Sequence, residues 1–181
     1  VSLARPVKGN AVRTTTSEGV DIVLLLDRSG SMKFEDLDPG RSRIDVAKEV
    51  VGAFAQRRMT DRVAAADNCA LIVFAQYPML LCPFTLDVDA ITGFLESLKP
   101  VENRAEDGTG IGVGLAKAVA VLREVPAKSR IVVLLTDGEN NQGTIDPRTA
   151  GQAAAALGIK VYTIGVGTEG VAPVPVGRGV F

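Results

Sequence analysis

Side chains that bear oxygen stand at alternate positions after an apolar run in the first part of the chain. Asp27, Ser29 and Ser31 follow the run 20–26, and Gly30 gives the backbone the freedom to curl so that the three side chains can converge. Carboxylate and hydroxyl oxygens are hard ligands, which suit Mg²⁺ or a similar cation and not a soft metal. The pattern therefore indicates a candidate cation site.

Two later segments offer ligands of the same kind. Asp137 follows a second apolar run, 130–136, and Thr109 stands just before a segment with helical periodicity. If the two apolar runs are parallel strands, their carboxyl ends lie on one rim of the sheet, where open α/β sheets bind their ligands. We expect these two side chains to join the first three at that rim.

The composition excludes several other kinds of site. The 181 residues include no histidine, which removes a Ser-His-Asp triad and the most common general base. The formal net charge of −1 gives no reason to expect nucleic acid or an anionic membrane surface as a partner. The glycines at alternate positions from 108 to 114 lack the spacing of a nucleotide-binding loop, so we expect them to allow close packing of the helix that follows.

The order of the expected elements indicates an α/β fold. Apolar runs that are typical of strands alternate with segments of helical periodicity, which predicts a Rossmann-like, doubly wound and mostly parallel sheet with helices on both faces. A hairpin adds one antiparallel edge strand. The expected strands are 20–26, 69–75, 79–84, 130–136 and 160–165, and the expected helices are 44–57, 88–98, 111–122 and 147–157.

Three details of this prediction are open to direct test. Asp87 and Asp146 are expected to cap the amino ends of two helices, with Pro147 as the first helical residue of the second. The run 160–165 is expected to be a buried strand like 20–26 and 130–136.

The two cysteines, Cys69 and Cys82, lie on the two arms of the predicted hairpin. If the arms pair symmetrically about Tyr77, residue 82 faces residue 72, which puts the two cysteines on opposite faces of the sheet. We therefore expect free thiols.

The length suggests one domain. Residues 1–18 are polar and are interpreted as a linker or arm, and residues 19–181 as the domain itself. The tail from Val166 is rich in Gly and Pro, which excludes a central strand there.

The ligand segments together resemble the von Willebrand factor A domain and its metal-ion-dependent adhesion site. The resemblance rests on Asp27-x-Ser29-x-Ser31, on Thr109 within Asp-Gly-Thr-Gly-Ile-Gly, and on Asp137 within Leu-Leu-Thr-Asp-Gly-Glu-Asn-Asn. Within that family the chain is most similar to bacterial Bat-type (aerotolerance operon) membrane proteins, over nearly its whole length from Gly19.

The resemblance implies a metal-dependent protein-interaction module and not an enzyme. Ser29, Ser31 and Thr109 would bind a divalent cation directly or through water, and Asp27 and Asp137 directly or through water-bridged contacts. The expected cation is Mg²⁺, with Mn²⁺ or Ca²⁺ as alternatives. An open coordination position would then receive an Asp or Glu carboxylate of a partner protein.

The resemblance also implies a cellular context. Bat-type relatives are anchored in the bacterial inner membrane by helices that flank this domain, which faces the periplasm. They are encoded beside a MoxR-type AAA+ ATPase and other von Willebrand A proteins, which are the expected partners in an assembly or stress system. No apolar run here approaches the roughly 20 residues that span a bilayer. The family continues past the Pro-rich tail into another helix and strand, which we expect this chain to lack.

A rival function and a simpler reading remain open. Asp27 could be the nucleophile of a metal-dependent phosphotransferase or hydrolase, but that chemistry wants a second Asp where this chain has Ser29. Taken singly, a Ser-Gly-Ser sequence after a strand is often only a turn, and an Asp at a strand end only a helix cap. It is the joint presence of Thr109 and Asp137 that favours the metal site.

Two residues at the same rim, Arg28 and Glu139, are candidates for binding the partner. For Arg28, a local ion pair with Asp36 or Asp38 is the simpler alternative.

Overall fold

The computed structural model describes residues 19–60, 66–126, 129–138 and 140–167. Residues 1–18 and the tail from 168, for which an arm and a region without a central strand are predicted, lie outside the described residues. The elements in chain order are β1 (Asp21–Asp27), the short 3₁₀ helix η1 (Gly30–Lys33), α1 (Arg43–Thr60), β2 (Asn68–Phe74), β3 (Pro78–Thr85), α2 (Val88–Ser97), α3 (Ile111–Arg123), β4 (Arg130–Thr136), α4 (Pro147–Ala156) and β5 (Lys160–Gly165).

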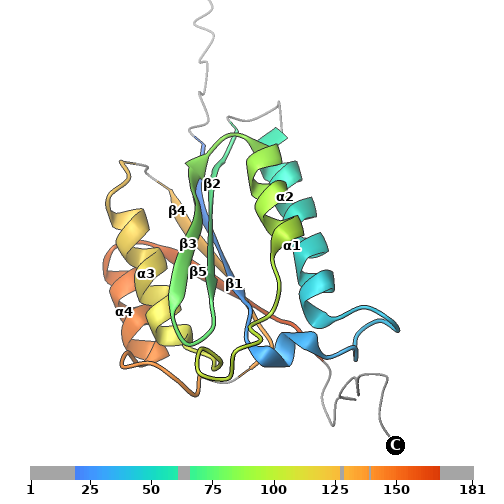
Figure 1. The fold of residues 1–181 in the computed structure, drawn as a ribbon. Helices are drawn as coiled ribbons and strands as arrows, with labels where there is room; N and C mark the ends of the chain where they lie inside the picture. The colour runs from blue at the N-terminus through green and yellow to red at the C-terminus, as the bar shows by residue number, and fades with distance from the viewer. Residues whose placement is uncertain (1–18, 61–65, 127–128, 139, 168–181) are drawn as a thin grey trace, which may run out of the picture.

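A five-stranded sheet in the order β3-β2-β1-β4-β5 forms the centre of the fold. Helices α1 and α2 cover one face of the sheet, and α3 and α4 cover the other (Figure 1). β1 pairs in parallel with β2 and β4, and β4 with β5, whereas β3 is antiparallel to β2 at the edge. This arrangement confirms the predicted doubly wound α/β fold with one antiparallel edge strand.

The apolar sequence of β1 reflects burial on both faces. Leu24 and Leu26 pack in the core under α1 and α2, while Val23 and Leu25 pack in the core under α3 and α4. All four side chains are fully buried. A central parallel strand has no solvent face, so its sequence is continuously apolar instead of alternating.

The predicted helix starts are confirmed. The Asp87 carboxylate accepts hydrogen bonds from the first backbone N–H groups of α2, and Asp146 does the same for α4. Pro147 occupies the first turn of α4, where its missing N–H costs nothing. Close packing of α3 is confirmed at Gly114, where an added Cβ would lie 3.1 Å from the Phe74 ring of β2.

The hairpin contains an irregularity that overturns one prediction. Both cysteines are free thiols, as expected, but Cys69 and Cys82 lie in the same core, on the face covered by α1 and α2. The register shifts on both sides of Leu71, which pairs with Cys82, whereas Ile72 pairs with Leu80. The bulge moves β3 by one residue relative to symmetric pairing, and a one-residue shift carries a side chain to the other face.

The prediction that β5 is buried is also wrong. Most of its residues are exposed, including Tyr162 at 50% and Ile164 at 41%. β5 is the last strand of the sheet described by the structure, and α4 packs against it. A run of apolar and β-branched residues predicts a strand but does not distinguish an edge strand from a central one.

Candidate functional site

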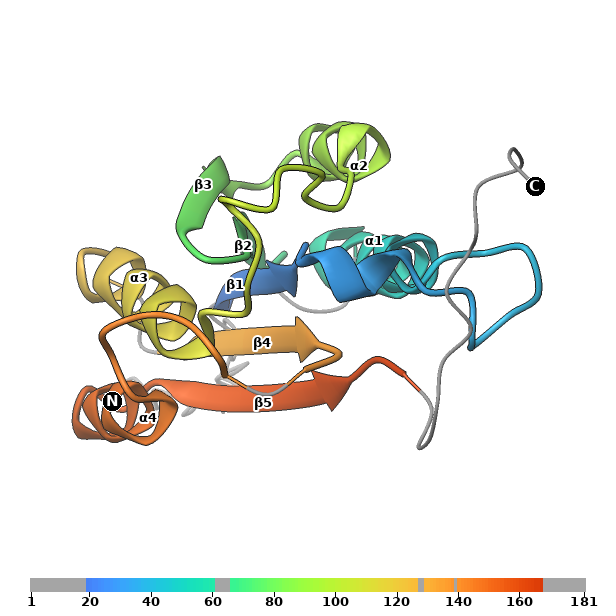
Figure 2. The same ribbon diagram turned by 60° about the horizontal axis from the view of Figure 1, so that its bottom comes forward.

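The carboxyl ends of β1 and β4 lie side by side, and this juxtaposition builds the site. Leu26 pairs with Leu135, so Asp27 ends β1 beside Thr136, and Asp137 follows directly. β1 leads to β2 on one side of the sheet and β4 leads to β5 on the other, so their shared rim is the topological switch point of the fold (Figure 2).

Asp27 is fully buried at this rim, and both of its carboxylate oxygens are hydrogen-bonded. Oδ1 accepts a bond of 2.8 Å from the backbone N–H of Ser29, and Oδ2 accepts one of 2.6 Å from Thr136 Oγ1. Burial raises the pKa of Asp27 to about 6, against the opposing effect of the two hydrogen-bond donors. The carboxyl group is therefore rigidly held in surroundings that penalise its negative charge.

A chain of three side-chain oxygens runs from Ser29 to Asp137. The hydroxyls of Ser29 and Ser31 are 3.1 Å apart, and Ser31 Oγ donates to Asp137 Oδ1 over 2.9 Å. Ser29 is 2% exposed, and the side chain of Asp137 is fully buried. Residues that are 106 positions apart in the sequence are thus in direct contact.

Arg43, the first residue of α1, fixes the other side of Asp137. Its Nη1 donates to Asp137 Oδ2 over 2.7 Å, and its Nε and Nη2 donate to the two oxygens of Asp36 over 2.7 and 2.6 Å. The side chains of Arg43, Asp36 and Asp137 are 8%, 3% and 0% exposed. Hydrogen bonding to Asp36 raises the pKa of Arg43, so the guanidinium stays charged. Asp137 consequently presents only Oδ1 to Ser31.

Thr109 reaches the site from the loop before α3. Its backbone N–H donates to Asn141 Oδ1 over 2.8 Å, and its carbonyl accepts from the N–H of Asn141 over 3.1 Å. A Cβ added to Gly138 would lie 3.6 Å from Thr109 Oγ1, which places this hydroxyl against the loop after β4. Thr109 is 4% exposed.

The loop before Thr109 is joined to the loop after β1 by Asp107. Asp107 Oδ1 accepts from the backbone N–H of Gly30 over 2.7 Å and from that of Gly108 over 2.8 Å. A Cβ added to Gly30 would lie 2.5 Å from Asp107 Oδ2, so any larger residue there would displace the Asp107 carboxylate. An open depression lies over these loops, lined by Ser29, Ser31, Arg104, Asp107, Thr109 and Asn141 among others. We call it the hydroxyl depression.

The spacing of the oxygens is compatible with a hexacoordinate cation. Neighbouring ligands of Mg²⁺ at 2.0–2.1 Å in octahedral geometry are about 3 Å apart. The distances of 3.1 Å between Ser29 Oγ and Ser31 Oγ, and of 2.9 Å between Ser31 Oγ and Asp137 Oδ1, match such an edge. The donor set therefore fits a hard cation both in chemistry and in spacing.

The candidate ligands of this site are hydroxyls as well as carboxylates. Among the residues that the structure describes, no group of three or more His, Cys, Asp or Glu side chains is placed to hold a metal ion. A cation at the hydroxyl depression would depend on neutral hydroxyls, with Asp27 and Asp137 as the only acidic members of the predicted set. Such a set cancels less of the charge of a divalent ion than three or more directly bound carboxylates would.

The structure brings the five predicted residues to one rim. Asp27, Ser29, Ser31 and Asp137 are joined in that order by direct hydrogen bonds, and Thr109 lines the same depression as the two serines. Of the two candidate partner-binding residues, Glu139 lies outside the described residues. Arg28 lies beside the depression, and the ion pairs of Asp36 and Asp38 are with Arg43 and Arg41 instead.

Sequence reasoning missed three residues that shape the site. Thr136 stands at the end of an apolar run directly before Asp137, and this position next to a strand-end carboxylate is a usable signal. Asp107 immediately precedes the Gly-Thr-Gly segment. Arg43 gave no local signal, because its partner Asp137 is 94 positions away.

Comparison with known proteins places this geometry in a family. The family model of the von Willebrand factor type A domain matches residues 22–139. An uncharacterized protein of Borreliella burgdorferi is 29% identical over 168 residues, which cover 93% of this chain and 47% of that protein. The chain thus spans about half the length of this curated relative.

Two solved structures share the fold closely. An aerotolerance-related membrane protein from Bacteroides fragilis superposes with a TM-score of 0.74 at 31% identity, over 89% of this chain and 74% of the other. BatB from Bacteroides thetaiotaomicron gives a TM-score of 0.75 at 32% identity, over 89% and 73%. In the part of this chain that the structure describes, no helix has the length and apolar character needed to cross a bilayer.

Proposed function

Because this chain belongs to the von Willebrand factor type A domain family, whose members often mediate protein–protein interactions, we propose that it is a metal-ion-dependent interaction module that binds an acidic residue of a partner protein. The observation that supports the proposal is the row of closely spaced oxygens from Ser29 through Ser31 to Asp137, whose two serines line the hydroxyl depression. Ser29, Ser31, Thr109, Asp27 and Asp137 would hold the ion, which we propose to be Mg²⁺, with Mn²⁺ or Ca²⁺ as substitutes.

The residues of the proposed site have different roles. The hydroxyls of Ser29, Ser31 and Thr109 offer neutral ligands, so little of the cation's charge is cancelled. Arg43 further offsets the charge of Asp137 through the bond to Oδ2. Once bound, the cation would supply a positive, incompletely coordinated centre that attracts a carboxylate. The depression above it is the route by which an Asp or Glu side chain of the partner would enter.

The geometry of Asp27 favours this function over the phosphotransferase alternative. A nucleophilic carboxylate needs an oxygen accessible to the substrate, whereas Asp27 is fully buried with both oxygens hydrogen-bonded. A phosphotransferase of this kind also needs a second carboxylate two residues after the nucleophile, where this chain has the Ser29 hydroxyl. We therefore propose a binding function without catalysis.

The similarity to Bat proteins supports a proposal about cellular context. Two solved relatives are described as an aerotolerance-related membrane protein and as BatB. We propose that this domain belongs to a bacterial Bat/MoxR-type assembly or stress system, held at the inner membrane by helices outside these 181 residues and facing the periplasm. Its partners there would be other von Willebrand A proteins and a MoxR-type AAA+ ATPase.

A calorimetric titration tests the metal-binding step. Mg²⁺ titrated into the cation-stripped domain should bind at one site, and Thr109→Ala and Asp137→Asn should weaken that binding by tenfold or more, as lost ligands do at about 1.4 kcal/mol per decade. Thr92→Ala is the matched control, because Thr92 bonds only to backbone carbonyls within α2. Equal Mg²⁺ affinity of the Thr109 and Thr92 variants, or no heat with the wild-type domain, would contradict the proposal.

A further inference from the structure

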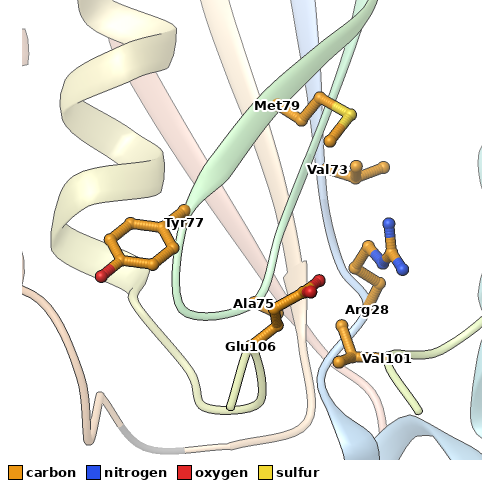
Figure 3. A pocket seen from close by; sticks show the side chains of 7 residues that line it. All are labelled: Arg28, Val73, Ala75, Tyr77, Met79, Val101 and Glu106. Atoms are coloured by element: carbon orange, nitrogen blue, oxygen red, sulfur yellow. The ribbon is translucent and has the colours of Figure 1, made fainter. Parts of the chain in front are cut away.

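A second cavity lies beside the hydroxyl depression. Its volume is about 210 Å³, and its lining includes Arg28, Val73, Tyr77, Met79, Val101 and Glu106. These residues come from the segment after β1, the β2–β3 hairpin and the stretch between α2 and α3 (Figure 3). We call it the Arg28 pocket.

The walls of the Arg28 pocket are mostly apolar. Val73 and Val101 are 1% and 5% exposed and belong to its buried side, while Met79 and Tyr77 are 54% and 72% exposed at its mouth. Met79 lies near the start of β3, and Tyr77 lies in the turn that precedes it. The pocket therefore offers an apolar side chain both a buried wall and an apolar rim.

Two polar side chains give the pocket a donor and an acceptor. The Nε of Arg28 is buried and has no hydrogen-bond partner among the described residues. The backbone of Arg28 is fixed by bonds of 2.8 Å to the Phe74 carbonyl and from the Val101 N–H. In Figure 3 the carboxylate of Glu106 points toward the guanidinium across the pocket. One positive and one negative group together favour a neutral occupant with both an acceptor and a donor, such as a peptide group.

The Arg28 pocket and the hydroxyl depression are lined by residues that are adjacent in the sequence. Arg28 lines the pocket and Ser29 the depression, and Glu106 lines the pocket and Asp107 the depression. Both pairs are consecutive residues, so the two cavities adjoin each other along the same two segments. A bound peptide with a carboxylate in the depression, bent so that the next side chain lies on the same side of its backbone, would place that side chain over the pocket.

From these observations we propose that the Arg28 pocket receives an apolar side chain adjacent to the acidic residue of the partner. The peptide carbonyl beside that side chain accepts from Arg28, and a peptide N–H donates to Glu106. The domain would then recognise a short segment with an acidic and an apolar residue side by side, and not a carboxylate alone. This inference rests on the proposed function and specifies the partner of the same site.

Short synthetic peptides provide the probe. Acetylated and amidated Gly-Asp-Leu-Gly and Gly-Leu-Asp-Gly are compared with versions in which Ser replaces Leu, by NMR titration of the isotope-labelled domain in Mg²⁺. All should shift the backbone amides of Gly30 and Thr109. At least one Leu peptide should also shift the Met79 methyl and the Val101 amide, and should bind about tenfold more tightly than its Ser version, as expected for burial of one aliphatic side chain.

Two exposed apolar residues give a matched pair of variants. Met79→Ser should abolish the preference for Leu while keeping Mg²⁺-dependent binding of the Ser peptides, because Met79 lines the Arg28 pocket and not the depression. Leu86→Ser is the control, since Leu86 is 63% exposed and lies at the other end of β3. Arg28→Gln should weaken both the Leu and the Ser peptides, because both contain the carbonyl that accepts from Arg28.

The peptide titrations distinguish failure of the pocket inference from failure of the proposed function. Equal binding of Leu and Ser peptides by the wild-type domain, or a preference for Leu that survives Met79→Ser, overturns the pocket inference and leaves the metal site intact. If no peptide shifts Gly30 or Thr109 in Mg²⁺, the proposed function fails and the inference fails with it.

Discussion

Arg43 donates a hydrogen bond of 2.7 Å to Asp137 across 94 positions of sequence, and so ties the first residue of α1 to the carboxyl end of β4. The same guanidinium holds both oxygens of Asp36. Because all three side chains are buried, the contact determines which oxygen of Asp137 faces Ser31. The side chains of the candidate site are therefore positioned by a buried ion-pair network as well as by the hydrogen bonds between them.

Arg43→Gln should strongly destabilise the fold. It removes the guanidinium that pairs with the buried carboxylates of Asp36 and Asp137, and removing one partner of a buried ion pair costs about 3–5 kcal/mol. Urea denaturation should show a loss of that size. Arg41→Gln is the control, because the Arg41 ion pairs are exposed and such pairs contribute about 1 kcal/mol at most. Similar losses for the two variants would show that the buried network is not what stabilises this end of the sheet.

Asp27→Asn should stabilise the cation-free domain at neutral pH. The pKa of Asp27 is raised from 3.8 to about 6 in the folded state, so the folded state binds the proton more tightly than the unfolded chain. This group therefore makes the fold less stable as the pH rises from about 4 to 6, by at most about 3 kcal/mol. Asparagine carries no charge and escapes this loss.

Urea denaturation in the presence of a chelator checks the Asp27 prediction. The advantage of Asp27→Asn over the wild-type domain should be 1–3 kcal/mol at pH 7.5 and should shrink toward zero near pH 4, on the order of magnitude that the shift allows. An effect of Asp27→Asn that is the same at both pH values would contradict the role assigned to burial of this carboxylate.

Gly30→Ala should disturb the site without touching a ligand. The added methyl would lie 2.5 Å from Asp107 Oδ2, so the Asp107 carboxylate must shift, which disturbs its bond to the Gly30 N–H and the loop that carries Thr109. We expect a loss of about 1–3 kcal/mol, typical of overpacking, and weaker Mg²⁺ binding.

Gly93→Ala is the matched control for Gly30→Ala. Gly93 lies in α2 with nothing within 4 Å of an added Cβ, so alanine there should stabilise by about 0.5–1 kcal/mol through helix propensity. Unchanged Mg²⁺ affinity in Gly30→Ala would mean that the contact with Asp107 does not position Thr109.

Both thiols should be unreactive in the native domain. Cys69 and Cys82 are 0% and 4% exposed, and burial raises the pKa of Cys69 to about 12. A thiol reagent at pH 8 should label neither cysteine in buffer and both in strong denaturant, in reducing or non-reducing preparations alike. Rapid labelling of Cys82 in buffer would contradict the placement of β3 with this side chain inward.

The fold was predictable from the sequence because most of its signals are local. Burial on both faces makes β1 and β4 continuously apolar. Asp87 and Asp146 are typical N-cap residues, and they predict where α2 and α4 begin. The exposure of β5 was not predictable, because it depends on what lies beside the strand and not on its own residues. The face of Cys82 was missed for a related reason, since a single bulge in the hairpin reverses it.

The candidate site was predictable where it follows directly from strand ends. Asp27 and Asp137 end neighbouring strands, so their meeting required only the topology. The contribution of Arg43 depends on how α1 docks on the sheet, and the Arg28 pocket depends on where the hairpin and the loop before α3 meet. Such contacts between distant segments leave no periodic or local pattern in the sequence.

The most direct measurement is a crystal structure of the domain grown with Mn²⁺, with anomalous data collected at the manganese edge. We predict one strong anomalous peak at the hydroxyl depression, with Ser29 Oγ, Ser31 Oγ and Thr109 Oγ1 within direct or single-water distance, about 2.2 or 4 Å. A peak bound only by other residues, or well-ordered hydroxyls with no peak between them, would contradict the claim that this rim is a metal-dependent binding site.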